Sequence, residues 1–297
     1  MGAIWSRLTI MSQSLDVAEN ALSESRGVGV KGTEYGITVV INTLNEESNL
    51  GECINSVRGL TDQIVVCDMH SEDKTQEIAR HSGARVVLHP RTGFVEPARR
   101  FAISHVRTEW VLVLDADERM TDVLSNKLKE VVAEDTCDAV SFWSLYWYFG
   151  GWVRHGGFFS GQWRRFFRRN IYFETYDEGE ELVHHNFVSL TKAKRVCQLP
   201  KDYYMLHYAY PTVEKYLSKT LGMYARIEGE QYVKLGRRFS LLRMIGEPVK
   251  EFSARFILRR GYLDGMRGFV LACLYAGYRF SVWANVWFLQ NGTESQR

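Results

Sequence analysis

The 297-residue sequence has little of several features that would assign it to a broad class of protein. Its five cysteines are odd in number and show no paired spacing, which argues against a disulfide framework or a zinc site and for a reducing compartment. A formal net charge of only +2 gives no indication of nucleic-acid binding. No apolar run is long enough to cross a bilayer, and the nearest, residues 268–278, is followed directly by Arg279. We therefore expect no nucleic-acid partner and no membrane-spanning helix.

The first 35 residues also lack a strand pattern and the apolar core of a signal peptide. Ser, Glu and Gly are frequent there, and a segment of that composition buries little apolar surface. We expect residues 1–35 to form a mobile leader.

From residue 36 the sequence alternates between apolar strands and amphipathic helices. The pattern predicts strands at residues 37–41, 64–67, 84–88 and 110–114, and helices at 48–58, from about 71–75, and at 97–106. This alternation is typical of a parallel α/β sheet that keeps its ligands at the carboxyl ends of the strands. No Gly-x-Gly-x-x-Gly motif follows the first strand, so we expect phosphate to be held differently from the usual dinucleotide fold.

Two carboxylates, Asp115 and Asp117, follow the fourth expected strand. Side chains two residues apart in an extended segment point the same way, so this pair can converge on one cation. Oxygen ligands favour Mg²⁺ or Mn²⁺, and these ions suit a diphosphate. The alternative is a strand that simply ends in polar residues, and this motif alone leaves both interpretations open.

Three motifs in order resemble glycosyltransferase family 2. They are Thr-Leu-Asn-Glu-Glu at 43–47, Val-Val-Cys-Asp-Met-His-Ser-Glu-Asp-Lys-Thr at 65–75 and Leu-Asp-Ala-Asp-Glu-Arg at 114–119. Within the family, the sequence resembles the bacterial lipopolysaccharide-core enzymes that add a glucose to an inner-core heptose. The resemblance covers about residues 36–216. It implies an inverting, metal-dependent transfer of a sugar, with a UDP-sugar as donor and a glycan or lipid-linked glycan as acceptor.

The resemblance also implies the domain organisation. We expect a nucleotide-sugar transferase (GT-A-like) α/β fold, with a mostly parallel sheet flanked by helices, over residues 36–211. Its nucleotide-binding half spans 36–120 and its acceptor half 121–211. A helical extension follows over 212–297.

The residues expected to bind the nucleotide follow from the same matches. Thr43, Asn45 and Glu46 match the family's loop that meets the nucleotide. Asp68 matches the acid that receives the base, because a carboxylate accepts the N–H of a uracil ring. Arg99 matches a basic residue near the phosphates, although a solvated helix face is the alternative.

The metal is expected between Asp115 and Asp117, with Asp115 also facing the nucleotide. The cation, Mn²⁺ or Mg²⁺, neutralises the leaving nucleoside diphosphate. His207 matches a late histidine of the branch that completes the coordination or contacts the diphosphate; a buried core histidine is the alternative.

An aromatic segment over residues 138–163 is expected on the sugar side. Aromatic faces stack on sugar rings, and the branch uses this loop for the acceptor, so we expect contacts from Trp152, Arg154 and His155. Gln162 and Arg165 fit a Gln-x-x-Arg motif that lies near the transfer site in the wider family. Core packing followed by a turn is the alternative for the aromatic run.

The catalytic base is the point at which the sequence departs from the family. The branch uses the Glu of a Val-His-Glu tripeptide, whereas residues 183–185 read Val-His-His. His185 can serve as base because an imidazole titrates near neutral pH. Glu181 or Glu180 can serve after a small shift in register. The third option is that the chain is a catalytically silent sugar-nucleotide-binding or scaffold protein.

The C-terminal segment 255–289 combines arginines with large apolar residues. Such a segment can lie in the headgroup layer of an anionic membrane, with Trp283, Trp287 and Phe288 as anchors, so we expect a peripheral protein at the inner face of the cytoplasmic membrane. Packing against the catalytic domain or a second copy is the alternative. An unrelated nucleotidyltransferase is a further alternative for the whole chain, but the Gly-rich basic loop that it needs after the first strand is absent.

Overall fold

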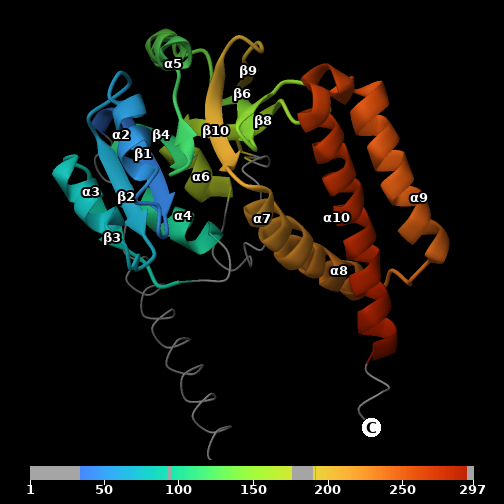
Figure 1. Ribbon diagram of the computed structural model, residues 1–297. Helices are drawn as coiled ribbons and strands as arrows, with labels where there is room; N and C mark the ends of the chain where they lie inside the picture. The colour runs from blue at the N-terminus through green and yellow to red at the C-terminus, as the bar shows by residue number, and fades with distance from the viewer. Residues whose placement is uncertain (1–33, 92–94, 176–189, 191, 293–297) are drawn as a thin grey trace, which may run out of the picture. The chain divides into compact units, whose positions relative to one another are not determined.

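The computed structural model describes residues 34–91, 95–175, 190 and 192–292 (Figure 1). The chain forms two compact units. The first consists of Met1–Phe142 and Gln162–Met205, and the second of Trp143–Gly161 and Leu206–Arg297. The aromatic segment 143–161 thus groups with the C-terminal residues rather than with the rest of the expected acceptor half. The expected leader, residues 1–35, lies almost entirely outside the described residues.

The first unit is a sheet with helices on both faces. Its strands are β1 (Glu34–Thr43), β2 (Ile64–Asp68), β3 (Arg85–Leu88), β4 (Thr108–Asp115), β5 (Glu118–Arg119), most of β8 (Ser160–Arg168), β9 (Val196–Gln198) and the start of β6 (Ala139–Tyr148). Its helices are α2 (Leu50–Val57), α3 (Thr75–His81), α4 (Glu96–Ser104), α5 (Asp122–Glu134) and α6 (Arg169–Thr175). Every strand and helix expected between residues 36 and 114 is present, with ends that differ by at most a few residues.

The strand order through this unit is β3-β2-β1-β4-β8-β6. The first four strands are parallel, with Val40 opposite Val65 of β2 and Val113 of β4. β8 runs antiparallel to β4, with Phe166 opposite Leu112. The sheet is therefore mixed, and the expected α/β fold with a mostly parallel core is confirmed.

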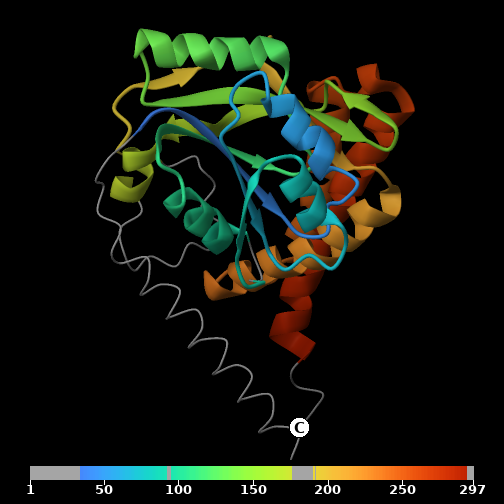
Figure 2. The ribbon, with the colours of Figure 1, turned by 90° about the vertical axis from the view of Figure 1, so that its left-hand side faces the viewer.

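Strand alternation divides the core of this unit between the two faces of the sheet. Val39 and Ile41 of β1 belong to a buried cluster with residues of α2 and α5, such as Ile54. Val40, between them, belongs to a second buried cluster with Ala98 of α4. Figure 2 shows the helices of this unit packed along the sheet. Because α4 covers the face of Val40, its polar residues can reach the end of β4 on that side.

The second unit contains the rest of β6 and a helical region. β7 (Gly151–Val153) pairs antiparallel with β6, with Trp152 opposite Trp147. The remaining elements are most of β10 (Tyr204–Tyr210), α7 (Val213–Tyr216), the π-helix η2 (Leu217–Tyr224), α8 (Ala225–Lys234), α9 (Leu241–Phe252), the π-helix η3 (Ser253–Leu258), the 3₁₀-helix η4 (Gly261–Asp264) and α10 (Gly265–Asn291). Among the described residues, none of the helices combines the length and the apolar character needed to span a bilayer.

Polar contacts join α10 to α8 and α9, which lie beside it in Figure 1. Arg279 donates to Glu228 (Nη1 to Oε1, 2.6 Å) and to Glu247 (Nη2 to Oε2, 2.5 Å). Burial alone raises the pKa of Glu228, but hydrogen bonds from Tyr278 and Arg279 outweigh it and hold the pKa below its ordinary value. Trp283 is fully buried, so its expected role as a membrane anchor is wrong: an indole in the protein core cannot reach lipid.

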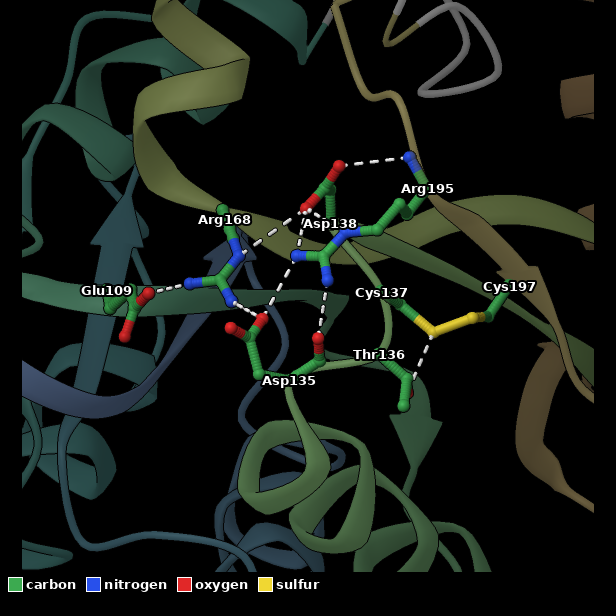
Figure 3. Close-up of polar contacts among 8 residues, drawn as sticks. All are labelled: Glu109, Asp135, Thr136, Cys137, Asp138, Arg168, Arg195 and Cys197. Carbon is green, nitrogen blue, oxygen red and sulfur yellow. Dashed lines mark hydrogen bonds and ion pairs between the residues drawn. A yellow bond between two sulfur atoms is a disulfide. The ribbon is translucent and has the colours of Figure 1, made fainter.

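A disulfide joins Cys137 to Cys197 (Figure 3). The two cysteines are 60 residues apart, but β6 and β9 are parallel neighbours with Val140 opposite Cys197, which brings their Cα atoms to 5.8 Å. The expectation of unpaired cysteines is therefore wrong, because spacing in the sequence does not show which strands become neighbours. The argument from cysteine for a reducing compartment loses its support.

Charged residues surround this disulfide at the start of β4, β6 and β9 (Figure 3). We call this group the amino-end cluster; it consists of Glu109, Asp135, Asp138, Arg168 and Arg195. Arg195 binds both aspartates through Nη2 (Asp138 Oδ1 at 2.8 Å, Asp135 Oδ1 at 3.0 Å), and Arg168 contacts Glu109 and both aspartates. These contacts connect four segments that are distant in sequence.

Candidate active site

The carboxyl ends of β1, β2 and β4 bring the expected nucleotide-binding residues to one edge of the sheet. Thr43 at the end of β1 is in register with Asp68 of β2. Its neighbour Asn42 is in register with Asp115 of β4. Side chains in register on parallel strands share a face, so Thr43 and Asp68 lie on one face and Asn42 and Asp115 on the other.

Asp68 is fully buried and shapes the turn between β2 and α3. Its carboxylate accepts hydrogen bonds from the backbone N and hydroxyl of Ser71 (2.9 and 2.5 Å) and from Nε2 of Gln76 (2.8 Å). A carboxylate has about four lone-pair sites, and these three bonds leave capacity for one more donor.

Asn45 and Glu46 connect the loop after β1 to the loop after β2. The side-chain oxygen of Asn45 accepts from the backbone N of Glu72 at 2.8 Å, and its backbone N donates to Ser71 Oγ at 2.8 Å. Glu46 donates its backbone N to Thr75 Oγ1 at 2.8 Å. Asn45 has a φ of +55°, a left-handed conformation that Asn tolerates better than most residues. The structure thus shows these two residues fixing the shape of the edge.

Asn42 is a residue of this edge that the sequence analysis did not select. Its side chain is buried, and neither amide atom has a hydrogen-bond partner among the described residues. The hydroxyl of Thr43 is also buried, and it also has no hydrogen-bond partner among the described residues. Buried polar groups almost always have partners, so unpaired ones at a strand end indicate a place for a ligand or water. The available signal was an amide directly after a run of β-branched residues.

Two arginines and two carboxylates meet at the end of β4; we call them the carboxyl-end cluster (Arg99, Asp115, Glu118 and Arg165). Arg99 Nη2 donates to both oxygens of Asp115, at 2.7 and 3.0 Å. Arg165 Nη1 donates to Oε2 of Glu118 at 2.6 Å, and its Nη2 lies 3.5 Å from Asp115 Oδ2. Glu118 is fully buried and also accepts from the backbone N of Asp115 at 2.8 Å. The structure therefore gathers the expected residues Arg99, Asp115 and Arg165.

The expected metal ligands differ in their positions in the fold and in their exposure to solvent. β4 ends at Asp115, and Asp117 lies in the following turn, so strand alternation does not orient the pair as we expected. Asp115 is 29% exposed and Asp117 is half-buried, and carboxylate oxygens such as theirs are the ligands that a hard cation prefers. His207 belongs to the second unit, where its ring lies 4.7 Å from that of Tyr146. In the described part of the chain, no three His, Cys, Asp or Glu side chains are grouped to hold a metal.

A buried thiol supports this edge from α2. Cys53 Sγ lies 3.7 Å from the backbone oxygen of Asp115, to which it donates. Burial raises the pKa of Cys53 well above its ordinary value, and the nearby carboxylates add to this. The thiol therefore stays neutral and adds no charge beside the cluster.

The residues expected on the sugar side fall in both units. Trp152 packs edge-on against Trp147 and Tyr208 in the second unit, at 5.0 and 5.3 Å between ring centroids. Arg154 and His155 donate their backbone N atoms to Asp264 at 3.2 and 2.8 Å, which fixes the turn after β7. Gln162 and Arg165 both belong to β8 of the first unit. The side chain of Gln162 lies outside the described residues.

The expected catalytic bases lie outside the described residues. His185, Glu181 and Glu180 all fall within 176–189, so the choice between them stays a prediction.

Comparisons with known proteins agree with this arrangement. A family model described as Glycosyl transferase family 2 matches residues 38–194. An uncharacterized glycosyltransferase of Rickettsia typhi is 29% identical over 256 residues, which cover 82% of this chain and 84% of the relative. The lipopolysaccharide core biosynthesis glycosyltransferase LpsC of Rhizobium meliloti is 26% identical over 269 residues, which cover 84% of this chain and 92% of LpsC.

Two solved structures share the fold. The mannosyltransferase PcManGT from Pyrobaculum calidifontis, in complex with GDP-Man and Mn²⁺, has a TM-score of 0.54 at 16% identity and covers 95% of this chain and 96% of that one. S. aureus TarS 1–349 in complex with UDP-GlcNAc has a TM-score of 0.51 at 17% identity, covering 86% and 92%. Both are structures of the GT-A-like type, and at these identities the likeness shows the fold alone.

Proposed function

The chain belongs to glycosyltransferase family 2, and we propose that it transfers the sugar of a UDP-sugar, with inversion, to a glycan or lipid-linked glycan. The observation that carries this proposal is the carboxyl-end cluster. It holds two guanidinium groups and a half-buried carboxylate, Asp115, where parallel strands end, which is where α/β sheets bind their ligands.

The donor would bind along the two faces of this edge. On one face, Asp68 has capacity for the N–H of the base, beside the unpaired hydroxyl of Thr43. On the other, the amide of Asn42 would donate to a diphosphate or ribose oxygen. Arg99 is already oriented at Asp115, and it can shift its charge-assisted bonds to a phosphate that enters there.

Asp115 and Asp117 would hold Mn²⁺ or Mg²⁺, which would offset the charge on the departing diphosphate. The proton of the acceptor hydroxyl would pass to His185 or Glu181, on the face of the sugar opposite the leaving group. Gln162 and Arg165 would border the transferred sugar.

A thermal-shift assay with nucleotide sugars tests the donor and the metal together. A ligand that binds only the folded state raises the melting temperature, so a UDP-sugar with Mn²⁺ should raise it and EDTA should cancel the rise. Asp117→Ala should abolish this shift and lower transfer by about 10²–10³-fold or more, as expected when charge stabilisation of a leaving group is lost. Asp62→Ala, which changes a carboxylate that is 88% exposed, is the matched control.

Wild-type transfer by Asp117→Ala would contradict the metal role. A donor-induced shift without any turnover would support the silent sugar-nucleotide-binding protein instead.

We also propose that the second unit contacts a membrane surface. α9 has no buried residue, and its Leu242 is 86% exposed; Leu258 of η3 is 79% exposed, and Arg259 and Arg260 follow it directly. Apolar side chains beside arginines suit an anionic lipid surface. The wild-type chain should float with anionic vesicles and Leu242→Asp/Leu258→Asp should not; equal flotation would disprove this contact.

A further inference from the structure

The second unit contains a cavity. None of the residues that were assigned above to the donor or to the metal contributes to its lining. Its volume is about 310 Å³, and seven of its lining residues are tyrosines. Tyr148 comes from β6, Tyr216 from α7 and Tyr275 from α10, and among the described residues of the lining only Arg255 of η3 is charged. We call it the tyrosine cavity. Small-molecule sites have volumes of roughly 300–1,000 Å³, so this one suits a single ring.

Arg255 is only 9% exposed and is held by aromatic faces. Its guanidinium carbon lies 3.5 Å from the ring centroid of Tyr275 and 4.8 Å from that of Phe158. Its Nη1 donates to the backbone oxygen of Gly156 at 3.2 Å, and its Nε lies 3.4 Å from Glu251. Among the described residues, the buried Nε has no hydrogen-bond partner. A charged donor therefore remains for a ligand.

Two phenols add neutral donors to the lining. Tyr148 and Tyr216 are buried, and both line the cavity. Burial raises the pKa of both groups above the ordinary value, and neighbouring tyrosines raise it further. Both hydroxyls therefore keep their protons and can donate. Ring contacts hold them in place, for example between Tyr148 and Tyr210, which stack at 5.6 Å.

This lining is rich in donors and aromatic faces, and the described residues that form it include no carboxylate. An aromatic face packs on the apolar face of a sugar ring. A guanidinium and phenolic hydroxyls form charge-assisted hydrogen bonds with a carboxylate or phosphate. We propose that the tyrosine cavity binds one acidic sugar residue of the acceptor, a uronate or a sugar phosphate. The role as an acceptor site rests on the proposed transferase function.

Calorimetry on the full chain without donor tests the cavity, with methyl glucuronide and glucose 6-phosphate as acidic probes. Methyl glucoside and inorganic phosphate are the neutral and ring-free controls. At least one acidic sugar should bind at least tenfold more tightly than either control. Tyr148→Phe/Tyr216→Phe should weaken this binding at least tenfold, because it removes two donors and keeps the rings. Tyr262→Phe, an exposed tyrosine outside the cavity, should change nothing.

Arg255→Gln should remove the preference for acidic over neutral sugar. If Arg255→Gln fails to fold, the Tyr148→Phe/Tyr216→Phe variant still tests the proposal. Equal binding of methyl glucoside, or wild-type binding by the tyrosine double variant, would overturn the proposal, as would phosphate binding as tightly as glucose 6-phosphate.

The donor-induced thermal shift, measured in parallel, separates this proposal from the function on which it rests. Tyrosine-dependent sugar binding without a donor shift would contradict the proposed transfer and support a sugar site. A donor shift without sugar binding would support the donor site and overturn the cavity.

Discussion

The two ends of β4 carry clusters of the same chemistry in opposite surroundings. The outer pair of the amino-end cluster is open to solvent, with Asp135 65% and Arg195 48% exposed, whereas Arg168 and Asp138 are 16% and 12% exposed; the cluster lies beside a disulfide. The carboxyl-end cluster encloses a fully buried carboxylate, Glu118, with an arginine that is 11% exposed. Exposed ion pairs contribute little stability, whereas a buried charge must keep its partner. The amino-end cluster joins distant chain segments, and we propose that the carboxyl-end cluster keeps charge ready for a ligand.

Breaking the buried pair should have the largest effect on stability. Arg165→Met leaves Glu118 uncompensated and should cost about 3–5 kcal/mol of the free energy of unfolding in urea. Arg195→Met, the matched change in the amino-end cluster, should cost about 1 kcal/mol or less. Similar losses in both variants would remove the distinction between the clusters.

The double variant Arg165→Met/Glu118→Leu sharpens the same test. Replacing both partners of a buried pair by apolar residues is often close to neutral for stability, so most of the lost free energy should return. Transfer activity should stay low, because the guanidinium is still missing. Recovered activity would show that Arg165 serves the fold only.

Removing the disulfide should have the next largest effect. Cys137→Ser/Cys197→Ser opens a 60-residue loop and should cost about 2–4 kcal/mol in the free energy of unfolding. Transfer at 25 °C should stay within about twofold of wild type, because the change lies at the other end of β4. Cys273→Ser, which alters an exposed free cysteine, is the control. A large loss of activity at unchanged stability would contradict the separation of the two ends.

A smaller effect is expected from pH at the amino-end cluster. Burial alone raises the pKa of Asp138, but hydrogen bonds from Arg195 outweigh it and hold the pKa below its ordinary value. Asp138 therefore stabilises the fold fully above its unfolded pKa of about 4, and this contribution disappears as the pH falls through the lower folded pKa. Asp138→Asn should flatten the acid side of the stability profile, and Asp62→Asn should not. Identical slopes for wild type and Asp138→Asn would show that the carboxylate gains nothing on folding.

The strand and helix pattern of the first unit could be predicted because it depends on local information. Buried parallel strands form continuous apolar runs, and β1, β2 and β4 end at polar residues that lie at the sheet edge, Thr43, Asp68 and Asp115. The family resemblance assigned Arg99 and Asp115 to one site, but the ion pair between them was not predicted.

Features that depend on distant contacts could not be predicted. Arg165 and Arg168 are three residues apart in one strand but enter different clusters, because strand alternation turns them to opposite faces. The pairing of Cys137 with Cys197 depends on which strands become neighbours. Asp117 lies in a turn whose shape no repeat in the sequence specifies.

The π-helix η2 has a consequence for how the tyrosine cavity can change. Tyr216, Thr220 and Tyr224 recur every fourth residue and all line the cavity. In an α-helix of 3.6 residues per turn, such a spacing drifts by roughly 40° at each step. The wider turn of the π-helix rotates each residue through a smaller angle, which offsets this drift along the residues that follow Tyr216. Deleting one residue from this segment would return it to ordinary winding and scatter the lining. The lining of the cavity therefore depends on the length of this segment as well as on its side chains.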